Sequence, residues 1–564
     1  MAGILTPTQI FKDLTITDTV KIEDLRLTNE DGITREEFYL LGKEFPSGRV
    51  KAYVVLEKPT GETSPLNAVI VVGKVKSNVN NYLIRDFAKK GYMAIGVDLS
   101  GEGEEEFSTI YPDEIAYARY SLSAVNQTSL TESANETCWF QWDSVLKYLL
   151  AYLKGREEVS KIAFVGIGDG AVPVWHVIAS GEKVSGAVIL SNAGWKGYKG
   201  DYKFEHNPEP NFSDEEFKFL AGIEPQAYAM HVKCPLYLLV PTNSEEYECD
   251  RAYDTLTRID PKVFTAINYS VGNRKVINKQ TFNGVYKFLD EAFNKTGNKK
   301  IPLADEVVVS LNVKENLDFE VLVKTEGLKN LELYVAEKTI KPSLRCFKRF
   351  TGAIMQKNNK YLFSIEKKEI ESDFVYFVKA DYEDGYGISS MINYANHTLD
   401  VITPKQKVVF SSREENGEKI FYPLVEENIS NLGVQVVEMP TVYLTRGPKG
   451  MFGATAKGGL LTFVINEKSG RPYEDAIFMM DAYVKEGGVI RIKLITDYFG
   501  SKTEYVHEGK IASDKYWQNI KVTSKEFKTI EGRALRSYKE VEAIEISLLN
   551  DEDKEFAVNN LIWV

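Results

Sequence analysis

The chain has 564 residues, 43% hydrophobic and 27% charged, with a formal net charge of −12 and a pI of about 5.3. This length predicts roughly three or four domains, and the acidic balance argues against nucleic acid as a partner. The absence of a secretory signal pattern, of a long apolar run and of CxxC spacing predicts a cytoplasmic protein with reduced thiols and no membrane partner.

The first half of the sequence alternates between strand and helix patterns, which predicts a doubly wound, mostly parallel sheet. Continuous apolar runs indicate strands that are covered on both faces, and amphipathic segments indicate the helices between them. In TESANETCWFQWDSVLKYLLAYLKG, Trp139, Trp142 and Leu146 recur at helical spacing, and we interpret them as core residues. The predicted strands are RVKAYVVLEKP, NAVIVVG, YMAIGVDL, KIAFVG, VSGAVILSN, CPLYLLVPTN and KVFTAINYS.

The pattern changes after the polar stretch NKTGNKKIPLADE, beyond which only strands of period two are found. We predict an α/β domain over residues 1–298, an immunoglobulin-like β-sandwich over 299–398 and a jelly roll over 399–564. Within the first domain, a polar insertion between Trp195 and His231 is expected to lie over the carboxyl ends of the strands, where ligands bind in such sheets.

The segment FVGIGDGAVPVWH, residues 164–176, runs from a buried strand through glycines directly into a helix. This is the pattern of a nucleophile elbow, G-x-S-x-G, in which a serine lies on a tight turn. Gly166 and Gly170 occupy the flanking positions, and Gly168 occupies the position of the serine.

Further segments are GVDLSGEGEEEFSTIYP, TCWFQWDSVLKYLLAYL, YAMHVKCPLYLLVPTN and RAYDTLTRID. With the elbow, they make the region from about Arg35 to Lys295 similar to the bacterial acetyl-xylan-esterase and dienelactone-hydrolase-like α/β-hydrolases. This resemblance implies an α/β-hydrolase fold and carboxylic-ester hydrolysis by a serine, an acid after the CP-strand and a histidine before the last helix. By the same resemblance, Gly168, Ser244 and Arg274 (or Lys275) stand at the three catalytic positions, so the triad is degenerate.

The histidine count supports this interpretation independently of the family. The five histidines are His176, His206, His231, His397 and His507, and none lies between the last predicted strand and the closing helix. The usual general base is therefore missing from its position. We expect His176 to face the core, and nothing in its spacing assigns His206 to a pocket.

Several residues could still form a binding site at this edge of the sheet. Backbone N–H groups at Asp169 and near Lys74 would form an oxyanion-like pair that is free to hold an anion, and Tyr111, Trp195 and Lys275 are candidate pocket residues. Asp169 is also a weak alternative nucleophile, but it would need a base to activate water. We interpret the acidic runs at 101–106 and 245–250 as solvated loops, and we expect neither a metal nor a cofactor.

Exposed aromatic rings in the β domains could bind sugars. Trp517, Trp563 and the hairpin around Tyr382 and Tyr386 are candidates, although core packing is the preferred interpretation of the two tryptophans.

Three functional hypotheses follow from the sequence. The first is a catalytically inactive esterase homologue that retains a pocket for a small molecule or glycan. The second is an active carboxylic-ester hydrolase with a non-standard site. The third is a carbohydrate-binding or scaffold protein that acts through the jelly roll.

Overall fold

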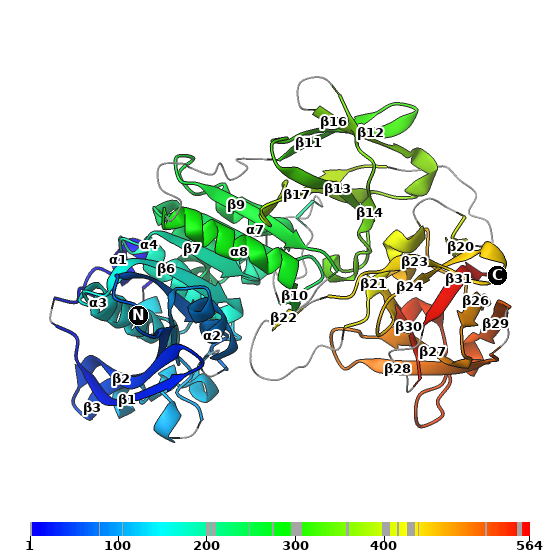
Figure 1. The fold of residues 1–564 in the computed structure, drawn as a ribbon. Coiled ribbons are helices and arrows are strands. Elements are labelled where there is room, and N and C mark those ends of the chain that lie inside the picture. Colours follow the sequence, from blue (N-terminus) through cyan, green and yellow to red (C-terminus); the bar gives the residue numbers. More distant parts are fainter. Residues whose placement is uncertain are drawn as a thin grey trace.

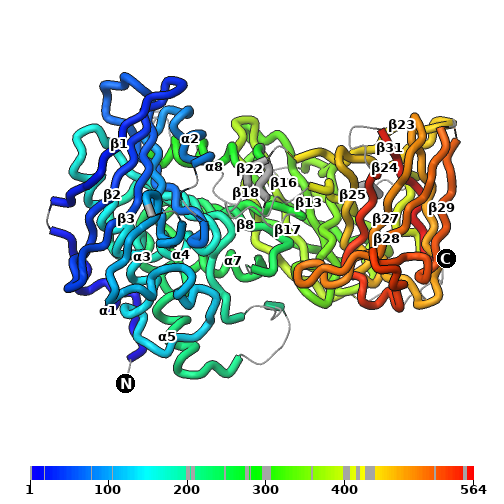
Figure 2. The backbone as a smooth tube through the Cα atoms, turned by 90° about the horizontal axis from the view of Figure 1, so that it is seen from below, coloured from blue at the N-terminus to red at the C-terminus, as the bar shows by residue number. Residues whose placement is uncertain are grey.

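The computed structural model describes most of the chain as three units: a first unit within residues 3–294, a second within 307–397 and a third within 407–564. In Figure 1 the first unit is blue to green, and the two β units follow in green and in yellow to red. Figure 2 shows the second unit between the other two. The residues outside the description are 1–2, 18, 78, 80, 104, 199–202, 205–209, 247–248, 273–275, 295–306, 357–359, 398–406, 414–416, 426–434, 438, 514–515 and 550–554.

The first unit is built on a nine-stranded sheet with the order β1-β2-β3-β5-β4-β6-β7-β8-β9. β1, β2, β3 and β5 are joined by antiparallel pairing, and the pairs from β5 to β9 are parallel. The predicted mostly parallel sheet is thus confirmed, but the sequence pattern did not reveal β1 and β2. The strands are β1 Ile22–Glu30, β2 Ile33–Phe45, β3 Gly48–Pro59, β4 Leu66–Val72, β5 Met93–Val97, β6 Val159–Ile167, β7 Gly186–Leu190, β8 Leu236–Pro241 and β9 Thr265–Ser270.

Helices cover both faces of this sheet. α3 and α4 share one apolar cluster with the sheet, α2 and α8 share another, and the predicted core residues Trp142 and Leu146 are fully buried in α3. Within the described part of the chain, the helices are too short or too polar to cross a bilayer. The helices are α1 Pro7–Ile10, α2 Asn81–Lys89, α3 Cys138–Lys154, α4 Ala171–Ala179, α5 Asp214–Gly222, α6 Pro225–Tyr228, α7 Cys249–Leu256 and α8 Lys279–Ala292.

The second unit contains two antiparallel sheets, β11-β12-β16-β15 and β14-β13-β17-β18, with β19 paired to β17. Side chains from both sheets, among them Phe319 and Val378, enclose one core. The strands are β11 Val308–Val313, β12 Asn316–Leu322, β13 Leu328–Glu337, β14 Lys348–Phe350, β15 Ile354–Met355, β16 Lys360–Glu366, β17 Phe374–Tyr382, β18 Gly387–Ser389 and β19 Asn393–Ala395.

The third unit also contains two sheets, β23-β24-β31-β26-β29 with β20 on β31, and β21-β25-β30-β27-β28. The change from α/β to all-β structure predicted after residue 307 is therefore confirmed. The strands are β20 Lys407–Phe410, β21 Tyr422–Pro423, β22 Gln435–Val437, β23 Tyr443–Arg446, β24 Phe452–Thr455, β25 Leu460–Thr462, β26 Ile477–Val484, β27 Gly488–Thr496, β28 Thr503–Ile511, β29 Gln518–Thr523, β30 Val541–Leu548 and β31 Phe556–Trp563.

The core of the second unit is continuous with one face of the first. A single cluster of buried side chains runs from Phe87 and Phe282 on the helices to Phe319 inside the sandwich. Hydrogen bonds at the sheet edge reinforce this junction: Tyr237 Oη donates to Gly387 O at 2.7 Å, and the backbone N–H of Tyr269 donates to Ser389 Oγ at 3.1 Å.

Residues 341–348 of the second unit, which we call the hub segment, touch both other units. The Arg345 guanidinium makes two hydrogen bonds to the Asp250 carboxylate of the first unit, at 2.5 and 2.8 Å, and both side chains are almost fully buried. The Lys341 ammonium lies 3.4 Å from Glu245 of the first unit and 3.3 Å from Glu542 of the third. The hub segment therefore fixes the arrangement of the three units.

We predict that Arg345→Met lowers the free energy of unfolding by about 3–5 kcal/mol, because it leaves the Asp250 carboxylate buried without its partner. Adding Asp250→Asn should recover part of this loss, since the unpaired charge is then removed. Urea unfolding of both variants measures the effect. The exposed control Arg533→Met should change stability by less than about 0.5 kcal/mol, and an equally small effect of Arg345→Met would contradict the prediction.

Two buried carboxylates share one lysine between the second and third units. Lys348 Nζ lies 3.5 Å from Glu337 and 3.1 Å from Glu467, and neither glutamate side chain is exposed. Burial raises the pKa of Glu467 to about 7, against the opposing attraction of Lys348. The folded protein therefore holds a proton on Glu467 more tightly than the unfolded chain does.

From this we predict a pH-dependent contribution to stability that is fully present below pH 4.5, the ordinary pKa of the group, and is lost as the pH rises through about 7. The loss should be on the order of 3 kcal/mol. Thermal unfolding between pH 5 and about 8 should show Glu467→Gln gaining stability relative to the wild type as the pH rises. The exposed control Glu474→Gln should follow the wild-type curve, and parallel curves for Glu467→Gln and the wild type would refute the assignment.

Candidate functional site

The predicted elbow is formed where β6 meets α4. A single turn at Gly168–Gly170 joins them, and Gly168 has a φ of +59°. Close approach explains the flanking glycines: a Cβ on Gly170 would lie 1.8 Å from Gly73 O, and one on Gly166 would lie 2.8 Å from Ala171 Cα. The chain thus keeps the tight turn of a nucleophile elbow, with a hydrogen where a nucleophilic side chain would start.

The neighbouring oxyanion position is occupied by the protein itself. The backbone N–H of Val75, in the loop between β4 and α2, donates to Asp169 Oδ1 at 2.8 Å. We expected N–H groups near Lys74 to be free for an anion; for Val75 this is wrong, because the Asp169 carboxylate uses the donor. Burial raises the pKa of this carboxyl, while the Val75 N–H and the Lys74 ammonium oppose the rise.

The loop at the predicted acid position, Thr242 to Ser244, binds the hub segment. Asn243 Nδ2 donates to Ser343 O at 2.9 Å and to Arg345 O at 2.8 Å, and the Asn243 side chain is 1% exposed. Ser244 Oγ accepts from the backbone N–H of Glu246 at 3.1 Å. The loop that was predicted to carry the triad acid is thus part of an interface between units.

The acidic side chains that follow this loop are engaged with cations rather than simply solvated. Glu246 pairs with Lys74 at 2.9 Å, Glu245 with Lys341 at 3.4 Å, and Asp250 with Arg345. Each of these carboxylates is held away from the role of orienting a histidine.

The predicted histidine position lies partly outside the described residues, since Arg274 and Lys275 are not included in them. These two assignments therefore remain predictions. The adjoining Gly272 is in contact with the third unit, because a Cβ there would lie 2.4 Å from the Tyr422 ring. β10 (Val276–Asn278) then pairs in parallel with β22 of the third unit.

His176 is a core residue, as expected. It is fully buried in α4, its Nδ1 lies 2.8 Å from Asp143 Oδ2, and its Nε2 lies 2.7 Å from Ile223 O. Its ring also stacks on Tyr228 at 4.1 Å. Both ring nitrogens are therefore engaged in the interior. His206 lies outside the described residues.

The two aromatic pocket candidates of the first unit pack into the interior. Tyr111 is 2% exposed and donates its hydroxyl to Leu99 O at 2.9 Å, and Trp195 is 7% exposed and donates from Nε1 to Thr255 Oγ1 at 2.8 Å. Both rings thus have structural contacts, and neither lines the cavity described below.

The aromatic candidates of the β units are also packed. Trp563 and Tyr386 are almost fully buried, and the Trp517 ring covers Gly447 and Gly453. Core packing is confirmed for Trp563, whereas Trp517 is half-buried. Tyr382 is 7% exposed and contributes to the cavity between the units.

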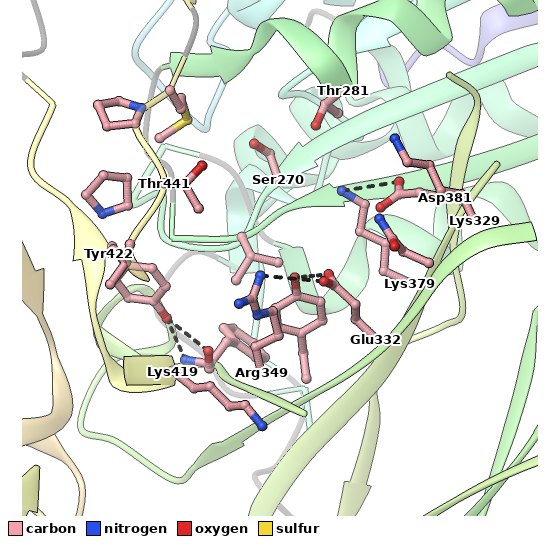
Figure 3. Close-up of a pocket in the computed structure, with 18 of the residues that line it drawn as sticks. Ser270, Thr281, Lys329, Glu332, Arg349, Lys379, Asp381, Lys419, Tyr422 and Thr441 are labelled. Carbon is pink, nitrogen blue, oxygen red and sulfur yellow. Dashed lines mark hydrogen bonds and ion pairs between the residues drawn. The ribbon is translucent and has the colours of Figure 1, made fainter. Parts of the chain in front are cut away.

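This cavity, which we call the three-unit cavity, has a volume of about 620 Å³. Figure 3 shows its polar lining, with side chains from all three units facing the same space. The labelled residues are Ser270 and Thr281 of the first unit, Lys329, Glu332, Arg349, Lys379 and Asp381 of the second, and Lys419, Tyr422 and Thr441 of the third.

Charges in the three-unit cavity are largely paired. The Arg349 guanidinium lies 3.5 Å from Glu332, which also accepts a hydrogen bond from Tyr334 Oη at 2.7 Å, and Lys379 Nζ lies 3.7 Å from Asp381. No sequence motif marked this site, because its residues come from many separate segments in three units; of these residues, only Tyr382 was singled out. The cavity offers donors, acceptors and ring faces without a strong excess of either charge.

No family model matches the chain, and no curated protein matches it. Among solved structures, the chain is similar to an acetyl xylan esterase from Paenibacillus sp. R4, with 15% identity, a TM-score of 0.35, and coverage of 48% of this chain and 87% of that one. It is also similar to acetyl xylan esterase 1 from Thermoanaerobacterium sp. JW/SL YS485, with 12% identity, a TM-score of 0.36, and coverage of 53% and 95%.

These likenesses cover about half of this chain and most of each of the two esterases. Their identities and TM-scores are too low to carry an activity over to this chain. Its function has to be argued from its own side chains.

We predict that Asp169→Ala lowers the free energy of unfolding by about 1.5–3 kcal/mol, because the Val75 N–H loses a charged acceptor. Asp169→Asn, whose amide oxygen can still accept this hydrogen bond, should cost less. Urea unfolding of the two variants tests this. If Asp169→Ala is as stable as the wild type, the carboxylate does not hold the loop.

Proposed function

We propose that this chain is a non-hydrolytic protein with an α/β-hydrolase fold, and that it binds a neutral, hydroxyl-rich small molecule, such as a short saccharide, in the three-unit cavity. The observation that carries the first part is the hydrogen bond from Val75 N–H to Asp169. An oxyanion hole works by leaving donors aimed at the place where negative charge develops. Here the Asp169 carboxylate already accepts the hydrogen bond of one such donor, the Val75 N–H.

The geometry also fails to meet the other requirements of ester hydrolysis. Gly168 supplies no nucleophile, and His176 is enclosed behind the elbow with both nitrogens engaged. An ester carbonyl would have to displace Asp169 from Val75, and a charged Asp169 left nearby would repel the developing oxyanion. Hydrolysis through an Asp169 nucleophile, the second hypothesis, would also need a base to activate water.

The three-unit cavity supports the binding part of the proposal. Its volume lies within the range of about 300–1,000 Å³ typical of small-molecule sites. The pairs Glu332–Arg349 and Lys379–Asp381 present donors and acceptors together, which suits hydroxyl groups better than an isolated charge. The rings of Tyr334, Phe347 and Tyr422 provide apolar faces beside them.

The third hypothesis, sugar binding by the C-terminal unit alone, has less support because Trp563 is buried and the half-buried Trp517 ring packs on Gly447 and Gly453. The finer assignments of the two β units, immunoglobulin-like for 299–398 and jelly roll for 399–564, remain proposals. The same is true of the cytoplasmic location.

The test has two arms. In the first, we expect 4-nitrophenyl acetate to be cleaved no faster by the purified protein than by the Asp169→Ala variant or by buffer. Turnover above background that Asp169→Ala abolishes would overturn the non-hydrolytic assignment. In the second, neutral mono-, di- and trisaccharides are titrated into the full chain by calorimetry.

For the second arm, we expect at least one saccharide to bind, and its affinity to fall about tenfold in Asp381→Asn, equivalent to about 1.4 kcal/mol. Asp318→Asn, on a strand of the same unit outside the cavity, is the matched control and should bind normally. No binding of any saccharide, or equal binding by Asp381→Asn and the wild type, would reject the three-unit cavity as the site.

A further inference from the structure

A second cavity of about 620 Å³ lies between the second and third units, and it shares no residue with the three-unit cavity. Thr339 and Ile340 line it from the second unit, where the chain leaves β13. Lys407, at the start of β20, lines it from the third unit with Lys468 and Arg471. We call it the cationic cavity.

Every charged side chain that lines the cationic cavity is a lysine or an arginine. This is unexpected in a chain with a net charge of −12. Over the described part of the chain, no carboxylate lies within 4.0 Å of Lys407, Lys468 or Arg471. Lys348, a buried cation at the same junction, has two carboxylate partners.

The polar contacts of these cations leave donors available. Lys407 is only 7% exposed, and its ammonium donates to the Lys468 carbonyl. Arg471 Nε donates to Ile465 O at 3.1 Å, and no acceptor for the terminal Nη groups of its guanidinium is found among the described residues. A guanidinium with open donors beside a buried ammonium is an arrangement that binds carboxylate or phosphate oxygens.

Burial and two neighbouring cations both act against the charged form of Lys407. Burial lowers the pKa of Lys407, and although Glu371 and Glu337 act in the opposite direction, Lys468 and Arg471 add to the lowering. Burial lowers the pKa of Arg471 as well. The positive charges are therefore close enough to repel one another, and a bound anion would relieve that repulsion.

The edge of the cationic cavity is apolar. Ile340 is 69% exposed and Tyr473 is 43% exposed, and Pro472 lies next to Tyr473 in the lining. A bare inorganic anion would leave these surfaces uncovered, whereas a ligand with a ring or a short apolar body would cover them.

We propose that the cationic cavity binds a small organic anion, a carboxylate or phosphate monoester attached to a ring or another apolar body. Arg471 and Lys407 hold the anionic group, with Lys468 adding attraction at the entrance, and Ile340, Pro472 and Tyr473 cover the apolar part. This site is independent of the proposed function, since it uses neither the elbow nor the three-unit cavity.

Calorimetric titration of the full chain with four probes tests the proposal: phenyl phosphate, benzoate, inorganic phosphate and the neutral benzyl alcohol. We expect phenyl phosphate and benzoate to bind, inorganic phosphate to bind more weakly, and benzyl alcohol not to bind. Affinity for phenyl phosphate should weaken as salt is raised, because the attraction is partly screened.

Arg471→Gln should weaken phenyl phosphate binding at least tenfold, or about 1.4 kcal/mol. Lys468→Gln should weaken it a few-fold; because Lys468 is exposed, this variant keeps the test valid if Arg471→Gln fails to fold. Arg533→Gln, an exposed arginine of the same unit, is the matched control and should bind like the wild type.

The proposal is overturned by any of three results. The first is the absence of phenyl phosphate binding up to about 10 mM, a concentration well above a millimolar dissociation constant. The second is unchanged binding in both Arg471→Gln and Lys468→Gln. The third is equal affinity for benzyl alcohol or inorganic phosphate, which would refute the organic anion as the ligand class.

Discussion

The ion pair between Arg345 and Asp250 is the contact on which the arrangement of the molecule depends. Both groups are almost fully buried, so the hydration that each has lost is replaced chiefly by the other. The same short segment places its carbonyls on Asn243 and its Lys341 between Glu245 and Glu542. The hub segment thus links the edge of the α/β sheet in the first unit to the third unit.

This constraint bears directly on chemistry at the sheet edge. A triad acid has to project from the loop after β8 and orient an imidazole. In this chain the loop is engaged elsewhere, since Asn243 binds backbone carbonyls of the hub segment and the nearby carboxylates are paired with cations. The structure thus uses, for docking between units, the loop that we predicted to carry a triad acid.

Much of the fold could be predicted from the sequence, because strands covered on both faces give continuous apolar runs and the elbow has its own glycine pattern. β1 was missed because it is exposed along nearly its whole length and lacks alternation. The hydrogen bond from Val75 N–H to the Asp169 carboxylate could not be predicted from the sequence, since it joins two loops that are 94 residues apart. In the sequence, the hub segment has the composition of an ordinary basic loop. It is buried only because its partners lie on the other units.

The continuous apolar core between the first and second units has a consequence for how the protein folds. Phe87, Phe282 and Phe319 belong to one cluster, so separating the units would expose the faces on which both are built. The two should therefore unfold in a single cooperative step and share one stability. A fragment cut near residue 298 would carry a large uncovered apolar surface and be prone to aggregate, so the boundary visible in the sequence is a change of architecture rather than a place where the chain divides into independent parts.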